Sequence, residues 1–418
     1  MDEAQRRSPV DADRHVQVYT ARRRERPPLP ETVMRRLAAR CFLLPLLALG
    51  APALSAQDAP SAAPAIPTIS TVKVTAASVP TPEQVLAIPP AMREMLQKQV
   101  ISRSYSRDQR LQALVEMIFS QHGLDLQYDA DATYTVSEIW QHQRANCLAF
   151  TLLFVTLARE AGIQARVQEV GQVVSWYQDQ DQGVVYNVGH VNAGVDVGGR
   201  YGTVDLDRNV LYDRHGPQPI GRERALAHYY NNRGAEQLAD GDLSGARAFF
   251  DAALAQDPEF ASTWNNIGVL DNRLGDDQAA RTALDTALRL DGRQSAALNN
   301  ASALYRKLGM TAQAEAMQKK LQSVQREDPF AQYMQGAQAE RAGDLDKAIT
   351  YYRRAVRLYD TAHQFHFGLA RVYFLTGRLQ RADRELLRAQ ELGGSTQQAR
   401  YQAKLDSLAR WRAQQAKR

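Results

Sequence analysis

Residues 138–162 read EIWQHQRANCLAFTLLFVTLAREAG and place Cys147 directly ahead of a long apolar run. Asn146 is a favourable residue for a helix N-cap, and Gly162 suits the position that follows a helix C-terminus. The segment LAFTLLFVTLA between them is apolar almost all round, which predicts a central buried helix. Cys147 would lie in the first turn of this helix, where the helix dipole favours a thiolate and free main-chain N–H groups can bind an oxyanion.

A strand–turn–strand pattern follows at residues 190–207, HVNAGVDVGGRYGTVDLD. The two glycines at 198–199 predict a two-residue hairpin turn between alternating strands. Pairing the residues on either side of that turn places Asn192 opposite Asp205. His190 then lies on the same face, diagonal to Asp205, at a backbone separation of roughly 7 Å that side chains can bridge. Strand geometry therefore predicts a His190–Asp205 couple.

The order of elements around these two patterns indicates the fold class. Helical patterns at 90–103, 107–121 and 135–143 precede the buried helix, and residues 163–171 alternate like a strand. Helices followed by an antiparallel sheet are typical of an α+β domain, which we expect to occupy residues 81–221.

The second half of the chain is repetitive. Small residues recur every 34 positions, which predicts five units over about 227–394 within a helical region spanning 222–394. The spacing resembles the tetratricopeptide repeat, although Gln318 and Leu321 depart from its pattern in the third unit. Residues 395–418 read as a polar capping helix and tail, which shield the last apolar face of a solenoid. The three in-phase series are Gly234, Gly268, Ser302, Gly336 and Ala370; Gly241, Gly275, Gly309, Gly343 and Gly377; and Ala246, Ala280, Ala314, Ala348 and Ala382.

The N-terminal segment has the layout of a secretory leader. Residues 34–56 combine a basic start, a short apolar stretch and small residues before a cleavage point, so we expect a signal peptide from Met34 and a periplasmic or secreted protein. The alternative is an uncleaved inner-membrane anchor. Residues 1–33 are interpreted as an over-extended N-terminus without a fold, and residues 57–80 as a disordered linker.

Charge argues against a nucleic-acid platform. The ten arginines and six acidic residues of segment 1–56 account for most of the net charge of +5, which leaves about +1 on the remainder. Basic residues such as Arg353, Arg354 and Arg357 are interpreted as solvated faces of repeat helices. No Cys or His pair has metal-ligand spacing, so we expect neither a metal nor a cofactor.

The chemistry-bearing segments also suggest a family. RANCLAFTLLFVTLAREAGIQARV together with HVNAGVDVGGRYGTVDLD resembles the transglutaminase-like, papain-related superfamily, more closely its bacterial secreted members that carry tetratricopeptide repeats. The family motif has Cys at a helix N-terminus, His on a strand and Asp about fifteen residues later, which correspond to Cys147, His190 and Asp205. The chain departs from close relatives at Gly189, where Arg is frequent, and in TVDLDRN, where the family has a DPT-like ending.

The resemblance implies an α+β transglutaminase-like domain followed by an all-α tetratricopeptide solenoid. It also implies a cysteine hydrolase or transamidase that acts on peptide amides through a thioester, with the Cys147 N–H as an oxyanion donor. Trp140 either lines the site or, as we favour, packs in the core. The repeats imply a protein or peptide partner, and a cell-wall peptide is one candidate substrate. The alternative is an inactive scaffold in which Cys147 is an inert buried thiol and the domain serves protein–protein interaction.

Overall fold

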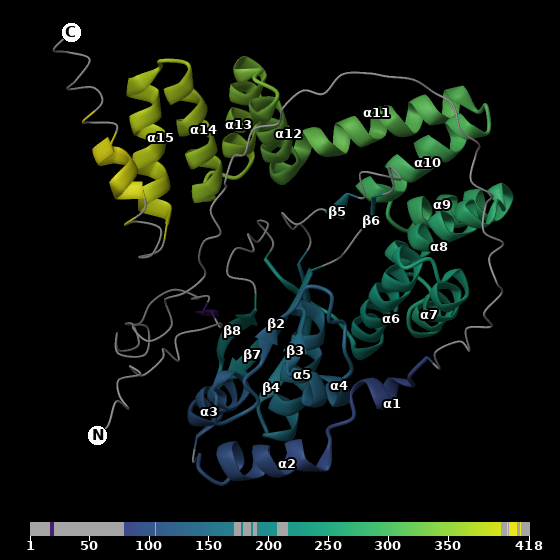
Figure 1. Ribbon diagram of the computed structural model, residues 1–418, viewed down its shortest axis with the longest axis vertical. Coiled ribbons are helices and arrows are strands. Elements are labelled where there is room, and N and C mark those ends of the chain that lie inside the picture. The colour runs from purple at the N-terminus through teal and green to yellow at the C-terminus, as the bar shows by residue number, and fades with distance from the viewer. Residues whose placement is uncertain are drawn as a thin grey trace, which may run out of the picture.

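A computed structural model describes an α+β domain joined to a helical array (Figure 1). The predicted signal peptide at 34–56 lies outside the described residues, as do nearly all of the linker at 57–80 and most of segments 1–33 and 395–418. The described residues are 17–20, 79–104, 106–170, 177–178, 185–186, 190–206, 216–393, 399, 401–407 and 410.

The helices of the first domain begin at well-formed caps. Three of them carry a capping box, in which the N-cap side chain accepts from a main-chain N–H while a Gln or Glu three residues later accepts from the N-cap N–H. Six helical segments precede strands β4 (Gln164–Val170) to β9 (Gln218–Pro219), in agreement with the predicted order of helices followed by strands. They are α1 (Pro82–Val85), α2 (Pro90–Leu96), the π-helical turn η2 (Gln97–Ile101), α3 (Arg107–Phe119), α4 (Val136–His142) and α5 (Cys147–Glu160).

A five-stranded antiparallel sheet forms the other layer of the domain, with strand order β1-β8-β7-β4-β9. The expectation that segment 1–33 contains no fold is wrong at its residues 17–20, because they pair with β8 as an edge strand. Two small pairs lie outside this sheet, β2 (Gln127–Tyr128) with β3 (Arg144–Ala145) and β5 (Tyr177–Gln178) with β6 (Val185–Tyr186). The five strands are β1 (Gln17–Thr20), β4 (Gln164–Val170), β7 (His190–Val197), β8 (Arg200–Asp205) and β9 (Gln218–Pro219).

The predicted hairpin register is confirmed. Val197 pairs with Arg200 and Ala193 with Val204, so the connection between β7 and β8 has only two residues. Gly198 has φ 63° and Gly199 has φ 79°, a left-handed conformation at both positions that a turn of this kind requires and that glycine adopts without steric cost.

The apolar helix α5 covers the sheet. It lies against β4 and β7, and its buried side chains include Phe150, Leu153, Phe154 and Leu157. Burial on most sides explains why its sequence is apolar nearly all round.

Five helix pairs follow in the array, and α6 to α15 curve past one end of the domain (Figure 1). The helices of each pair approach closely where the sequence places a small residue: a Cβ added at Gly268 would lie 2.6 Å from Leu284 Cγ, and one at Gly336 would lie 2.7 Å from Tyr352. The pairs are α6 (Arg222–Ala239) with α7 (Leu243–Gln256), α8 (Ala261–Leu274) with α9 (Asp277–Leu290), α10 (Ser295–Lys307) with α11 (Thr311–Glu327), α12 (Pro329–Arg341) with α13 (Leu345–Leu358), and α14 (His363–Leu375) with α15 (Leu379–Leu392).

The third pair is the irregular one, as its sequence indicates. Its second helix, α11, is 17 residues long and buries only Ala314 and Leu321. Ser302 replaces the usual glycine and its hydroxyl donates to the carbonyl of Ala314 at 3.0 Å. The strand β6 lies against α10 of this pair.

The first helix pair shares the core of the preceding domain. Leu226, Tyr229 and Tyr230 of α6 and Phe249 of α7 belong to the same buried cluster as α5. The phenol of Tyr230 also donates to the carbonyl of Pro80 at 2.7 Å. Residue 221 therefore marks the change from an α+β fold to paired helices, but the hydrophobic core continues across it.

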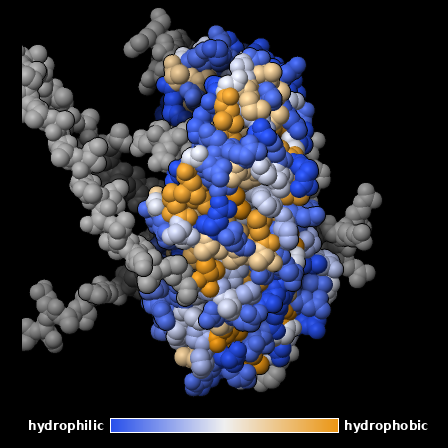
Figure 2. Space-filling view, turned by 90° about the vertical axis from the view of Figure 1, so that its right-hand side faces the viewer, coloured by the Kyte–Doolittle hydropathy of each residue, from blue (hydrophilic) through white to orange (hydrophobic). Residues whose placement is uncertain are grey.

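The surface is mixed in character. On the face that Figure 2 presents, apolar side chains reach the surface in separate patches surrounded by hydrophilic residues. No helix within the described ranges is both long and apolar enough to cross a bilayer.

Candidate active site

The N-terminus of α5 holds Cys147 in a fixed position. Asn146 caps the helix, and its Oδ1 accepts from the N–H of Ala149 at 2.9 Å. The Asn146 amide is held in turn by Thr133, to whose hydroxyl it donates at 2.7 Å. Cys147 is half-buried and is the first residue of the helix.

The β7–β8 hairpin supplies the other two predicted residues. His190 begins β7 and Asp205 ends β8, and the Nε2 atom of His190 lies 2.9 Å from Oδ2 of Asp205. Asp205 is 1% exposed and His190 is 8% exposed, so the pair is shielded from water. Because a carboxylate only accepts, Nε2 carries the proton and donates to Asp205.

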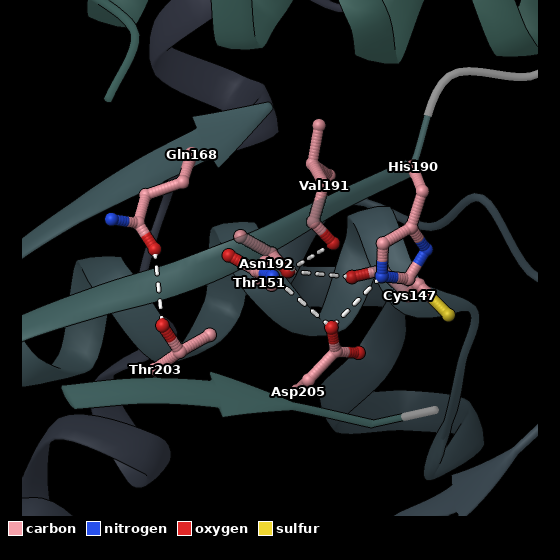
Figure 3. A network of polar contacts seen from close by, with 8 residues as sticks. All are labelled: Cys147, Thr151, Gln168, His190, Val191, Asn192, Thr203 and Asp205. Carbon is pink, nitrogen blue, oxygen red and sulfur yellow. Dashed lines mark hydrogen bonds and ion pairs between the residues drawn. The ribbon is translucent and has the colours of Figure 1, made fainter. Parts of the chain in front are cut away.

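The same imidazole also faces the thiol. Figure 3 draws the Cys147 sulfur on the side of the ring away from Asp205. The Cys147 side chain acts on the same imidazole, since with Asp205 it raises the pKa of His190. The structure thus brings together Cys147, His190 and Asp205 from a helix and two strands.

The charge balance at His190 favours the imidazolium. Burial lowers the pKa of His190, but the hydrogen bonds and charges of Asp205 and Cys147 outweigh it and raise the pKa to about 10. The imidazole therefore holds a proton at neutral pH whenever the neighbouring sulfur is a thiolate, as in an ion pair poised for nucleophilic attack.

Two further residues support the triad. Asn192 is fully buried and its Nδ2 donates to Oδ2 of Asp205 at 3.1 Å, which fixes the carboxylate from a second direction. The Thr151 hydroxyl lies 2.7 Å from the Cys147 carbonyl and 3.4 Å from the Val191 carbonyl, so it links α5 to β7 (Figure 3). The strand register places Asn192 opposite Asp205, but nothing in the sequence marks Thr151.

A main-chain donor is available beside the thiol. The N–H of Cys147 is at the first helical position, and no hydrogen bond from it is found to any residue that the structure describes. It is therefore free to donate to an oxyanion on a carbonyl attacked by the sulfur. Trp140 is partly buried against the domain core, which agrees with a packing role.

Three other histidines take part in structural contacts. His228 of α6 bonds Glu169 of β4 at 2.6 Å, and His366 of α14 bonds Glu385 at 2.7 Å. His363 bonds the phenol of Tyr401 at 2.7 Å. No group of His, Cys, Asp and Glu side chains within the described residues has the arrangement of a metal site.

Comparison with known families identifies both halves of the chain. The model of the transglutaminase-like superfamily matches residues 94–205, and a tetratricopeptide repeat model matches residues 231–297 and 333–395. The unmatched interval between the two repeat segments contains most of the irregular third pair.

Three solved structures that are similar to this chain each cover less than half of it. YrrB, described as a tetratricopeptide repeat protein with an unusual peptide-binding site, is 19% identical over 43% of this chain and 92% of its own, with a TM-score of 0.24. PilF of Pseudomonas aeruginosa is 15% identical over 45% of this chain and 90% of its own, with a TM-score of 0.26. MamA of Desulfovibrio magneticus RS-1 is 21% identical over 41% of this chain and 96% of its own, with a TM-score of 0.23.

No curated protein matches the chain. The two family matches agree with the architecture described above: a small α+β domain with a Cys–His–Asp constellation, then paired helices at a spacing of 34 residues. The chain therefore carries a transglutaminase-like domain followed by tetratricopeptide repeats.

Proposed function

We propose that the protein is a cysteine-dependent acyl-transfer enzyme that acts on peptide amides and uses its repeats to bind a protein or peptide partner. One observation carries the proposal: a thiol at a helix N-terminus lies beside an imidazole that is bonded to a buried carboxylate. Nucleophile, base and orienting group in that order are the arrangement that covalent catalysis through a thioester requires.

The chemistry follows from the positions of the three groups. The Cys147 thiolate attacks the amide carbonyl carbon, and the Cys147 N–H donates to the resulting oxyanion. His190, held by Asp205, gives its proton to the departing amine nitrogen as the C–N bond breaks and a thioester forms. Water or an amine then loses a proton to His190 and attacks the thioester carbon, and the C–S bond breaks to release the Cys147 thiolate. Water gives hydrolysis, and an amine gives transamidation.

Profiling of products from peptide libraries and cell-wall fragments tests the proposal directly. We expect the wild-type protein to release new amines or to form new amide bonds, and Cys147→Ser to do neither. A mass label from ¹⁸O-water in the carboxyl product would indicate hydrolysis, and a new amide would indicate transamidation. Identical product profiles for the wild type and Cys147→Ser would contradict the proposal.

A second candidate is a scaffold with no turnover. It is favoured by the core that the domain shares with the first repeat, because such continuity suits a rigid platform for the array. Alkylation kinetics separate the two candidates. A scaffold thiol should react with iodoacetamide at the rate of an ordinary cysteine, whether or not His190 is present.

We further propose that the protein is secreted or periplasmic, on the basis of the leader-like segment at 34–56. A reporter fused after residue 80 and expressed in a Gram-negative host would test this. The reporter should appear outside the cytoplasm, and deletion of residues 34–56 should retain it inside.

A further inference from the structure

A basic pocket lies between the last two repeats. It has a volume of about 430 Å³ and opens where α13 and α15 both pack against α14. The lining residues are Arg353, Val356 and Arg357 of α13, Leu369 and Tyr373 of α14, and Arg381, Arg384 and Glu385 of α15.

Several arginines of the array are paired with carboxylates, whereas the four arginines of the pocket have no such partner among the described residues. Arg371 forms a fork with Glu340, Arg293 pairs with Glu327 at 2.7 Å, and Arg378 pairs with Asp346 at 3.1 Å. No ion pair from any of the four pocket arginines is found within the part of the chain that the structure describes. The pocket carboxylate Glu385 is bonded to His366 and so is engaged elsewhere.

The spacing of the arginines along the two helices brings their charges close together. Arg353 and Arg357 lie four residues apart on α13, and Arg381 and Arg384 lie three apart on α15, so each pair shares a helix face. Like charges at this spacing are destabilising unless an anion offsets them. Arg353 and Arg357 are exposed, as their interpretation as solvated charges predicts, but they line one pocket together. Arg354 takes no part in it and donates to the carbonyl of Arg326 at 2.8 Å.

The cluster does not come from the repeat pattern. Two repeats earlier, the positions that correspond to the four arginines hold an acidic residue, one arginine, an amide and an alanine. Those residues are Asp285, Arg289, Gln313 and Ala316. One repeat earlier, the corresponding positions hold two lysines, a serine and a threonine, which are Lys319, Lys347, Ser323 and Thr350. The full set of four arginines is therefore found only at this pair of repeats among the three compared.

The floor of the pocket is apolar. Val356 and Leu369 contribute aliphatic surface, and Tyr373 contributes a ring over which the Arg381 guanidinium lies at 5.8 Å. A ligand that matches both parts needs anionic groups around an apolar portion. A volume of this size accommodates about two or three amino-acid side chains and not a folded surface.

We infer that this pocket binds an acidic peptide segment, in which carboxylates contact the four guanidinium groups and an apolar side chain lies on Leu369 and Tyr373. A guanidinium group and a carboxylate form two parallel hydrogen bonds in one plane. Recognition therefore depends on the orientation of the carboxylate as well as on its charge. The inference rests on the proposed role of the repeats in binding a partner, and it does not depend on the chemistry of Cys147.

Fluorescence polarisation on the full-length chain tests the inference. The probe is a labelled peptide of sequence Glu-Glu-Asp-Leu-Glu-Glu, and its neutral counterpart is Gln-Gln-Asn-Leu-Gln-Gln. We expect the acidic peptide to bind, with affinity that falls as salt rises, and to bind at least about tenfold more weakly to the double variant Arg357→Glu/Arg381→Glu. Binding to Cys147→Ala should equal binding to the wild type, so failure of this site and failure of the enzyme are distinguishable.

The matched control is Arg289→Glu, because Arg289 occupies the position of Arg357 two repeats earlier and is also exposed. This variant should retain wild-type affinity, and a thermal melt should show both variants folded. Equal binding to all three proteins would overturn the inference, as would equal binding of the neutral peptide. Displacement of the peptide by millimolar inorganic phosphate, or preferential binding to phosphatidylglycerol vesicles, would also overturn it in favour of a phosphate site or a membrane surface.

Discussion

The two halves of this molecule build their structures from different kinds of contact. In the transglutaminase-like domain, Cys147 meets a strand pair that begins 43 residues later, and the sheet pairs residues 17–20 with β8. In the array, each helix packs mainly on its neighbours in sequence, at positions repeated every 34 residues. The domain therefore concentrates its chemistry at one point, whereas the array can lose a contact locally and keep the rest.

Removal of the thiol should cause the largest loss of amide turnover. Cys147→Ser should lower amide turnover by at least about 10³-fold, because the hydroxyl is not ionised by the same partners. Steady-state assays on the substrate found by product profiling would measure this, with circular dichroism as the check on folding. Turnover close to wild type would exclude Cys147 as the nucleophile.

Loss of the orienting carboxylate should come next. Asp205→Asn keeps the shape of the side chain but removes the charge that holds the His190 imidazolium, so we expect a roughly 10²-fold loss of turnover. Glu169→Gln is a matched control, because Glu169 also bonds a buried histidine, His228, but at the junction with the array. An equal loss in both variants would indicate a structural effect of carboxylate removal and not an effect on the triad.

A larger side chain between paired helices tests whether each repeat is stabilised mainly by its own contacts. A side chain at Gly336 would contact the ring of Tyr352, so Gly336→Val should destabilise the fourth repeat by about 1–3 kcal/mol and leave Cys147 alkylation unchanged. Gly234→Val crowds Phe250 in the first repeat, which shares the domain core. This variant should alter both the stability of the repeat and the rate of Cys147 alkylation. Urea unfolding followed by circular dichroism and by thiol labelling measures the two effects separately. Equal effects of both substitutions on labelling would contradict the comparison.

A smaller effect should follow at Asn192, which donates a hydrogen bond to Asp205. Asn192→Ala should lower turnover roughly tenfold with little change in KM, because the carboxylate keeps His190 but loses its second hydrogen bond. Comparison of kcat with KM checks this role. A change confined to KM would place Asn192 in substrate binding instead.

Much of the fold was predictable because its signals are local. The apolar run after Asn146 predicts α5, the glycine pair at 198–199 predicts the hairpin, and the 34-residue period predicts the paired helices. The His190–Asp205 couple was predictable as well, since a two-residue turn fixes which residues of the strands face each other.

The parts that sequence patterns missed depend on contacts between distant elements. Thr151 links α5 to β7 through main-chain carbonyls, and no pattern of residue types specifies such a bond in advance. The strand at residues 17–20 pairs across almost the whole domain sequence. The arginine pocket arises because the helix faces of two repeats converge, although each pair of charges resembles a solvated face when read alone.

The pH dependence of Cys147 alkylation by iodoacetamide shows whether the thiol and the His190 imidazole act as an ion pair. Because the pKa of His190 is raised to about 10, the imidazolium persists up to that pH and is lost above it. The account predicts rapid alkylation at pH 6.5, where an ordinary thiol with a pKa of about 8.5 is almost unreactive, a further change in rate near pH 10, and slow alkylation at pH 6.5 in His190→Ala. A single rise centred near pH 8.5, the same in the wild type and in His190→Ala, would contradict it.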